Sequence, residues 1–431
     1  MKRAALLLAA VAALVLPAMA FAQDFAITHA KVAIGDGSEP IADGTVLVRA
    51  GKIVAAGAGV AVPAGVPVVD GTGKWVTPGL FSSVTDLGLW DVEAVDTSND
   101  LEADDSPFNA ALDVSYAINP SSQHIAVSRE GGVTRASVAP FNGKSIFAGQ
   151  GALIDLGADP NAVMVPRAFQ VVELGEGGAR LAGGSRVAAY VELHNALAEA
   201  RDIAATPASR RSDAMLTRAD ATALVPVVEG RQPLYVGVER AADIRQVLAL
   251  KTEFPKLDLV IVGATEGWMV ASELAAAKVP VVTVPLTDLP VSFEDLGATQ
   301  SNVGRMVKAG VKVAIGNFTG MNQPRFAPQQ AGNLVALNKV PGATGLTWGQ
   351  ALAAITSVPA DISGMGGKAG VLKAGAVGDV VIWDGDPLEV SSAPLAVYID
   401  GVQQPLDNHQ SRLKKRYRDL DESTLPKAYD W

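Results

Sequence analysis

The stretch that decides the fold is residues 76–86, which read Val-Thr-Pro-Gly-Leu-Phe-Ser-Ser-Val-Thr-Asp. It stands at the end of a β-rich amino-terminal segment, residues 24–78. Further along, from about residue 230, the hydrophobic pattern changes its period. Apolar Val/Ile/Leu runs, typical of strands covered on both faces, now alternate with segments of helical spacing. This alternation predicts parallel βα units, with buried strands at residues 234–238, 259–262, 281–284 and 311–315.

The overall composition is that of a large globular protein. The chain has 431 residues, of which 49% are hydrophobic and 19% charged, and its formal net charge is −10. This length favours a large α/β barrel with a smaller accessory domain. The acidic balance makes nucleic acids and anionic lipids poor partners. The absence of cysteine excludes disulfides, lipid-anchored cysteines, thiolate ligands and thiol nucleophiles.

The amino terminus has the pattern of a secretory signal peptide. Lys2 and Arg3 precede the apolar run Ala4 to Leu16, which is too short to cross a bilayer comfortably. Ala20-Phe21-Ala22 has the small-x-small form of a cleavage site, and Ala18-Met19-Ala20 is a second such site. We therefore expect a periplasmic or secreted protein that begins at Gln23 and is free of the membrane after cleavage.

Strand patterns return near the carboxyl end of the chain. Residues 376–388 read as a strand that closes on an acidic turn, and residues 396–401 as a second strand. β-rich segments at both ends suggest one composite sandwich built from the two termini. The predicted regions are a signal peptide at 1–22, a composite β-sandwich from 23–78 plus 362–405, a barrel at 79–361 and a charged tail at 406–431.

Four motifs, in order along the chain, resemble the amidohydrolase superfamily, in its imidazolonepropionase-like, metal-dependent hydrolase branch. Residues 42–53 resemble the family's amino-terminal hairpin, and residues 71–80 its entry into the barrel. Residues 131–134, Gly-Gly-Val-Thr, resemble its turn into the second barrel strand, and residues 374–387 its returning sandwich strand. The resemblance implies a (β/α)8 TIM-type barrel with the site at the carboxyl ends of its strands. It also implies one or two divalent metals that generate a hydroxide.

The metal ligands that the resemblance implies are replaced in this chain. They are two histidines from strand one, one histidine each from strands five and six, an aspartate from strand eight and, in many members, a carboxylated lysine. The corresponding positions hold Val84, Asp86, Gly237, Gly263 and Phe318, and Asp155 stands at the position aligned with the lysine. Glycine, valine and phenylalanine side chains cannot ligate a metal.

The histidine inventory leads to the same conclusion without any alignment. The chain has only His29, His124, His194 and His409, and no two of them have ligand spacing. We read each as an ordinary surface or core residue. We therefore expect no histidine-based binuclear centre and no cofactor.

Carboxylates could have replaced the lost ligands. Asp86, Glu239 and Glu266 follow the ends of strands one, five and six, and Asp155 is a fourth candidate. Convergent carboxylates serve acid–base work or bind a cation, although ordinary rim residues are the simpler interpretation. The acidic loop after strand one includes an alternating Asp96-x-Ser98-x-Asp100-x-Glu102 pattern. It lacks the glycine and the closing glutamate of a calcium loop, which favours a solvated loop.

These observations leave three functions open. The first is a catalytically degenerate, metal-free homologue that binds a ligand or acts as a partner subunit, as a homo-oligomer or beside an active amidohydrolase relative. The second is a hydrolase of non-peptide carbon–nitrogen bonds that uses a rebuilt carboxylate site. The third is a small-molecule binder that uses the vacated pocket, where Gly237 and Gly263 leave room.

Overall fold

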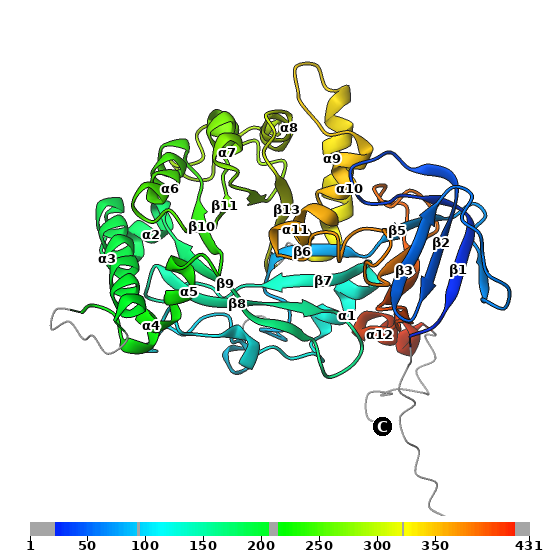
Figure 1. Cartoon of the computed structure of the whole chain (residues 1–431), viewed down its shortest axis with the longest axis horizontal. Helices are drawn as coiled ribbons and strands as arrows, with labels where there is room; N and C mark the ends of the chain where they lie inside the picture. The colour runs from blue at the N-terminus through cyan, green and yellow to red at the C-terminus, as the bar shows by residue number, and fades with distance from the viewer. Residues whose placement is uncertain (1–21, 93–94, 207–213, 321–322, 419–431) are drawn as a thin grey trace, which may run out of the picture.

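The computed structural model describes residues 22–92, 95–206, 214–320 and 323–418. Residues 1–21 of the predicted signal peptide, Glu93 of the acidic loop and the last part of the charged tail lie outside these ranges. Two units stand side by side, with a barrel on one side and a β-sheet on the other (Figure 1). No helix in the described ranges is both long and apolar enough to cross a membrane.

The barrel is closed by eight strands, which confirms the predicted fold class. The four strands expected from the alternating pattern are present as the fifth to eighth of them. In chain order they are β6 (Leu80–Thr85), β7 (Val133–Val138), β8 (Phe147–Asp155), β9 (Val163–Glu173), β10 (Leu234–Val238), β11 (Leu259–Gly263), β12 (Val281–Thr283) and β13 (Val313–Phe318).

One barrel strand, β8, runs opposite to the other seven. Its connections, residues 139–146 and 156–162, are shorter than the dozen or so residues that a parallel crossover needs, so the chain forms hairpins there. The reversal places the end of β8 at the amino-terminal end of its neighbours, where Asp155 pairs in register with Arg135 of β7.

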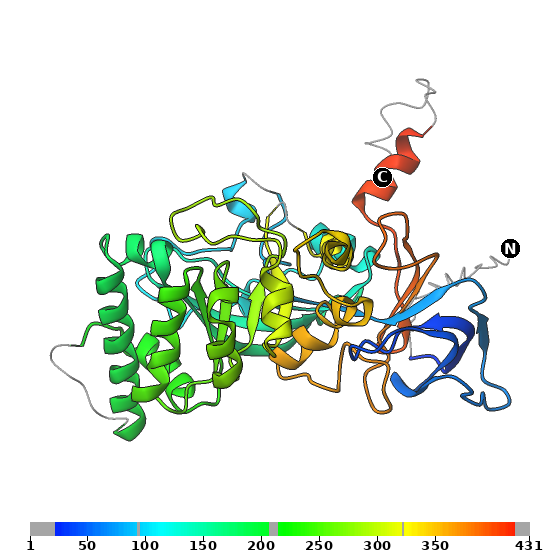
Figure 2. The same ribbon diagram turned by 90° about the horizontal axis from the view of Figure 1, so that it is seen from above.

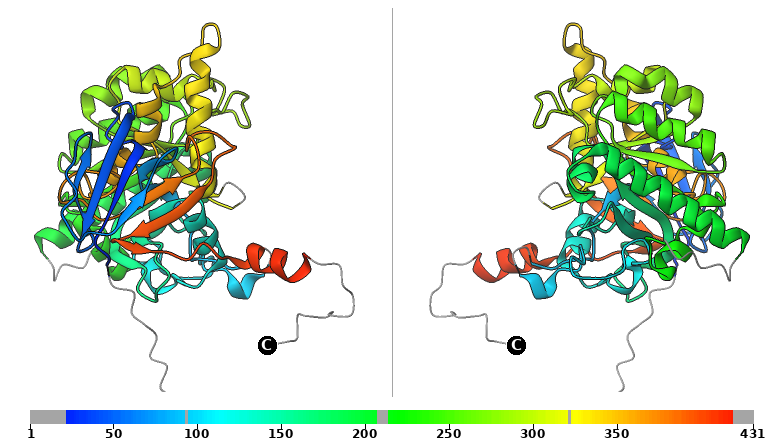
Figure 3. Two further views of the ribbon diagram at one scale, coloured as in Figure 1. Left: turned by 90° about the vertical axis from the view of Figure 1, so that its right-hand side faces the viewer. Right: turned by 90° about the vertical axis from the view of Figure 1, so that its left-hand side faces the viewer.

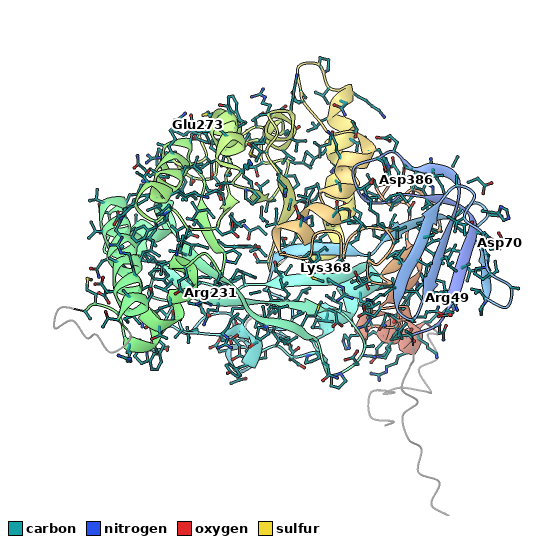
Figure 4. The ribbon with its side chains drawn as sticks, in the orientation of Figure 1. Arg49, Asp70, Arg231, Glu273, Lys368 and Asp386 are labelled. Atoms are coloured by element: carbon teal, nitrogen blue, oxygen red, sulfur yellow. The ribbon has the colours of Figure 1, made fainter. Side chains whose placement is uncertain are left out.

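Helices cover the outside of the barrel, and several of them line its outer rim in Figure 1. Charged residues such as Glu273 of α7, which pairs with Arg245 of α6 at 2.9 Å, point outward (Figure 4). The α-helices are α1 (Gln123–Glu130), α2 (Gly175–Leu181), α3 (Arg186–Ala205), α4 (Arg218–Ala223), α5 (Val225–Val228), α6 (Ala241–Glu253), α7 (Ala271–Ala277), α8 (Asn302–Lys308), α9 (Ala327–Ala336), α10 (Trp348–Ala353), α11 (Ser357–Ile362) and α12 (His409–Tyr417). Short 3-10 turns are η1 (Asp96–Ser98), η2 (Val114–Tyr116), η3 (Gly267–Val270), η4 (Pro324–Phe326) and η5 (Leu337–Lys339).

Strands from both ends of the chain share the second sheet. Its order is β16-β15-β14-β5-β1-β2-β3, with β4 paired to β1. The junction between the two ends is the antiparallel pair of β5 with β14. Its strands are β1 (Phe25–Val32), β2 (Ile41–Arg49), β3 (Lys52–Gly57), β4 (Val68–Asp70), β5 (Trp75–Pro78), β14 (Val380–Trp383), β15 (Pro394–Ile399) and β16 (Val402–Gln403). Helix α12 follows this sheet and projects from the body of the molecule (Figures 2 and 3).

Two of the motifs that carry the family resemblance, residues 71–80 and 131–134, meet where the chain enters the barrel. A β-carbon added to Gly79 would lie 2.1 Å from the Thr134 hydroxyl oxygen, so only glycine fits beside the start of β7. The Trp383 indole donates a hydrogen bond to the Thr77 hydroxyl at 2.9 Å and joins β14 to β5. Side-chain packing explains why these motifs hold the residue types they do.

The interior of the barrel is filled by its own apolar layer. The residues of this layer alternate along the strands with residues that pack outward against the helices. They include Phe81, Val84, Leu153, Phe169, Tyr235, Val260, Val282 and Ala314. The barrel is therefore a packed core, and open space is confined to its ends.

Candidate ligand-binding site at the barrel mouth

A cavity of about 210 Å³ opens at the carboxyl ends of the barrel strands. Five of the barrel strands or the residues that directly follow them supply most of its wall, and the connection after β7 supplies the rest. Its lining residues are Val84, Ala139, Pro140, Phe141, Asn142, Val171, Glu173, Tyr235, Gly237, Val238, Glu239, Val262, Asn317 and Thr319. This is the end of the barrel at which the resemblance implies the site.

Glu173 is the last residue of β9, and its carboxyl faces this cavity. Among the described residues, none donates a hydrogen bond to that carboxyl and none forms a salt bridge with it. Burial, together with the negative charges of Glu239 and Glu294, raises its pKa from 4.5 to about 8, against a smaller opposing effect of Arg180. At neutral pH Glu173 is therefore mainly protonated, and can donate as well as accept a hydrogen bond.

Glu239 lies one residue beyond β10 and is the second acid of the cavity. Its Oε2 accepts hydrogen bonds from the Thr265 backbone N–H at 2.8 Å and from the Thr265 hydroxyl at 2.7 Å. Burial raises its pKa to about 7, the Thr265 hydrogen bonds oppose that rise, and the charges of Asp295 and Glu294 add to it. The two acids thus line one cavity, and the negative charge of Glu239 disfavours ionisation of Glu173.

These two carboxyls occupy the space that a side chain at position 237 or 263 would take. A β-carbon added to Gly237 would lie 2.0 Å from Glu173 Oε2, and one added to Gly263 would lie 2.2 Å from Glu239 Oε1. Side-chain β-carbons essentially never come so close to another heavy atom, so a histidine at either glycine requires an acid to move. Gly263 also has a φ of 97°, which disfavours any L side chain there. The room that the glycines leave is therefore filled from neighbouring strands.

Val84, at the first position where the resemblance implies a strand-one ligand, lines the cavity. Its φ is 56°, a left-handed conformation that is unusual for a β-branched residue. The Val84 N–H donates to the Ser137 hydroxyl at 2.8 Å, which holds the strand end in place. Backbone strain of this kind is typically concentrated at functional sites.

Asp86, the second position of strand one, is buried but does not line the cavity. Its Oδ2 accepts a hydrogen bond from the Gly320 N–H at 2.7 Å. Burial raises the pKa of this carboxyl, and the Gly320 hydrogen bond opposes the rise. Asp86 thus ties the end of β6 to the segment after β13.

The other two predicted rim acids do not join the cavity. Glu266 accepts hydrogen bonds from the Ala241 N–H at 2.9 Å and the Gly297 N–H at 3.0 Å, so it holds the start of α6 against the loop after β12. Asp155 lies at the opposite end of the barrel, because β8 is reversed, and burial raises its pKa to about 6. Of the four rim candidates, the structure therefore places Glu239 at the cavity and Asp86, Glu266 and Asp155 away from it.

The strand-eight position also differs from the expectation. Phe318 is fully buried in the core between barrel and helices, and it does not line the cavity. Asn317, with a φ of 60°, and Thr319 line it instead. Asn317 and Glu173 are the site residues that sequence reasoning missed. The signal for Glu173 is a single acid at the end of the apolar alternation Phe169 to Val172.

The donor set does not fit the metal centre that the resemblance implies. Within the described ranges, no three histidine, aspartate or glutamate residues come together in a way that could hold a metal ion. This includes the Asp96–Glu102 loop, where the Ser98 hydroxyl instead bonds to backbone carbonyls of residues 92 and 95. The histidines belong to separate elements, namely His29 to β1, His124 to α1, His194 to α3 and His409 to α12.

A model of the amidohydrolase family matches residues 184–403, just over half of the chain. The chain belongs to the amidohydrolase family. Amidohydrolase tasK of Hapsidospora irregularis is 52% identical over 60 residues, which are 14% of this chain and 6% of that protein. This chain therefore spans only a small part of that curated relative.

Solved structures share the fold across most of their length. An amidohydrolase from Thermotoga maritima MSB8 superposes with a TM-score of 0.76 at 24% identity, over 88% of this chain and 99% of that one. An adenosine deaminase from Xanthomonas campestris with bound zinc gives 0.51 at 16% identity, over 92% and 97%. A triazine hydrolase from Arthobacter aurescens gives 0.51 at 15% identity, over 91% and 97%. At these identities the likeness concerns the fold alone.

Proposed function

We propose that this protein is an exported, catalytically degenerate member of the amidohydrolase family that binds a small molecule at its barrel mouth without a metal. The observation that carries the proposal is the position of the Glu173 and Glu239 carboxyls, which stand where side chains from Gly237 and Gly263 would have to lie. Two acids and two glycines replace a histidine set, and two carboxyls alone are a poor site for zinc.

The proposed loss of metal is tested by elemental analysis of protein purified without chelator. We expect no stoichiometric zinc, manganese, iron or calcium, and no heat of binding when zinc is titrated in. One metal per chain that disappears in Glu173→Gln would overturn the proposal. The same titration with Glu102→Gln, an exposed acid of the loop after β6, controls for loss of negative charge.

A hydrolase of non-peptide carbon–nitrogen bonds is a second candidate, because Glu173 and Glu239 form a pair of acids with different, raised pKa values. In this version Glu239, the more acidic of the two, acts as general base and Glu173 as general acid. Glu239→Gln should then abolish the hydrolysis of a cyclic or acyclic amide by purified protein. Turnover that Glu239→Gln leaves unchanged would remove this candidate.

A role as a subunit of an oligomer is favoured by one exposed apolar segment. Leu289, Val291, Phe293 and Leu296, in the loop after β12, are 67–88% exposed. Apolar side chains gathered in this way are typical of contact surfaces, and a stable contact buries about 1,000 Å² or more. Sedimentation of the purified protein should show a concentration-dependent dimer that Phe293→Ser dissociates. A monomer at every concentration would exclude self-association through this loop.

A further inference from the structure

The mouth cavity is acidic on one side only, and it contains no cation of its own. Glu173 and Glu239 are its two ionisable acids, and no lysine, arginine or histidine lines it. The positive charge that lowers the pKa of Glu173 is that of Arg180, which lies outside the lining. Both acids are half-buried, and carboxyls held partly out of water are normally paired or bound to a metal. In this cavity the compensating charge is missing from the described part of the chain.

Several acceptor atoms at the mouth receive no hydrogen bond from the described residues, and they stand beside the donors that the Asn317 amide and the Thr319 hydroxyl supply. The Glu173 carboxyl receives no hydrogen bond, and Glu239 uses only its Oε2, which Thr265 holds. The amide nitrogen of Asn142 donates to the carbonyls of Ser145 at 3.0 Å and Ile146 at 2.8 Å, so both of its N–H groups are used. Its amide oxygen is the atom left to accept. Such a set of acceptors is suited to a ligand that brings several donors.

The floor of the cavity is apolar. Val171 and Tyr235 lie two residues earlier on their strands than Glu173 and Gly237, and so one layer deeper in the barrel. Val84 completes this apolar layer, in which the Tyr235 ring stacks on its neighbour in β9 with ring centroids 4.3 Å apart. The volume of about 210 Å³ exceeds the roughly 150 Å³ of an apolar cavity that holds benzene.

Building on the proposed ligand-binding role, we propose that the ligand is a small organic ammonium ion. Its ammonium group donates to the Glu173 and Glu239 carboxylates, and its hydrocarbon part lies on the floor formed by Val84, Val171 and Tyr235. An ammonium ion supplies both the missing positive charge and up to three donors. A neutral or anionic ligand of the same shape supplies neither, and an anion would face two acids.

Three probes of one shape test this inference, namely benzylammonium, benzyl alcohol and benzoate, titrated into the purified protein by calorimetry at pH 8. We expect benzylammonium to bind at least about tenfold more tightly than either other probe. We also expect Glu173→Gln and Glu239→Gln each to weaken it at least about tenfold, which corresponds to 1.4 kcal/mol. Glu102→Gln, in the exposed loop, should leave binding unchanged.

The outcomes separate this inference from the proposed function. Preferential binding of benzyl alcohol or benzoate would overturn the ammonium inference and leave a metal-free binding site in place. Benzylammonium binding that survives both glutamine variants would overturn it as well. Stoichiometric metal in the purified protein would instead overturn the proposed function. Circular dichroism of each variant ensures that a loss of binding is not a loss of fold.

Discussion

The two ends of the barrel differ in whether a charged side chain held out of water has a partner of opposite charge. At the amino-terminal end of β7, Arg135 is buried and bound by two carboxylates, Asp379 at 2.7 Å and Asp400 at 2.8 Å. Although burial alone would lower its pKa, these two partners raise it. At the carboxyl end, Glu173 is half-buried and has no partner among the described residues. The paired charges of Arg135 and its two aspartates join the barrel to the sheet. The unpaired carboxyl of Glu173 instead indicates a place where a ligand binds.

The largest loss of stability should come from removing Arg135, the buried cation at the amino-terminal end of the barrel. Arg135→Ala leaves Asp379 buried without its partner, and a broken buried pair typically lowers the free energy of unfolding by about 3–5 kcal/mol. Urea denaturation measures this loss. The matched control is Arg49→Ala, which removes an exposed pair with Asp24 and should lower it by no more than about 1 kcal/mol. Equal effects of the two substitutions would show that the Arg135 cluster is not a structural joint.

A histidine introduced at the mouth should lower the stability of the protein, because the two acids already fill the space it needs. Gly237→His places a β-carbon against Glu173 Oε2, and overpacking of this kind lowers stability by about 1–3 kcal/mol. Thermal melts measure the change. In the double variant with Glu173→Ala, the loss should be smaller than the sum of the two single effects, because the clash is gone. If the two single losses of stability simply add in the double variant, the side chains at positions 237 and 173 do not compete for one space.

A smaller change in the free energy of unfolding, which depends on pH, should follow when Glu173 is replaced by a neutral side chain. Because the folded-state pKa of Glu173 is raised, its contribution to stability is fully present below about pH 4.5 and is lost as the pH rises through about 8. Glu239, Glu294 and Arg180 are the charged groups that influence it. Glu173→Gln should therefore raise the free energy of unfolding at pH 9, by on the order of 2 kcal/mol, and change it little at pH 5.

Urea midpoints across pH 5–9 measure this dependence, and Glu102→Gln serves as the exposed control. A Glu173→Gln protein that loses stability equally at all pH values would indicate that the carboxylate itself makes stabilising contacts, contrary to the comparison of the two ends.

Much of the fold follows from sequence patterns with a local cause. Continuous apolar runs predict β10 to β13, and Asp379 in the Gly-Asp-Val-Val motif proves to be the partner of Arg135. The reversal of β8 follows from connection lengths that are too short for a parallel crossover. That reversal is also the reason why Asp155 lies far from the mouth, a consequence that the position of a residue at a strand end does not reveal by itself.

The site was harder to predict, because it depends on side-chain direction. Glu266 and Glu239 both follow barrel strands, yet Glu266 binds the backbone at the start of α6, whereas Glu239 faces the cavity. Phe318 turns into the outer core, where the positive φ of Asn317 breaks the alternation of the strand. Gly237 and Gly263 were visible in the sequence. The filling of the space beside Gly237 by Glu173, and of that beside Gly263 by Glu239, depends on packing between neighbouring strands.

The most direct test of the central claim is the titration of Glu173 itself, followed by carbon NMR of glutamate side chains and assigned by its absence in Glu173→Gln. The uncompensated environment predicts a carboxyl that is still mainly protonated at pH 7 and titrates with a pKa near 8. A carboxyl that titrates at its ordinary pKa of about 4.5 would contradict the account, because Glu173 would then already have a partner for its charge.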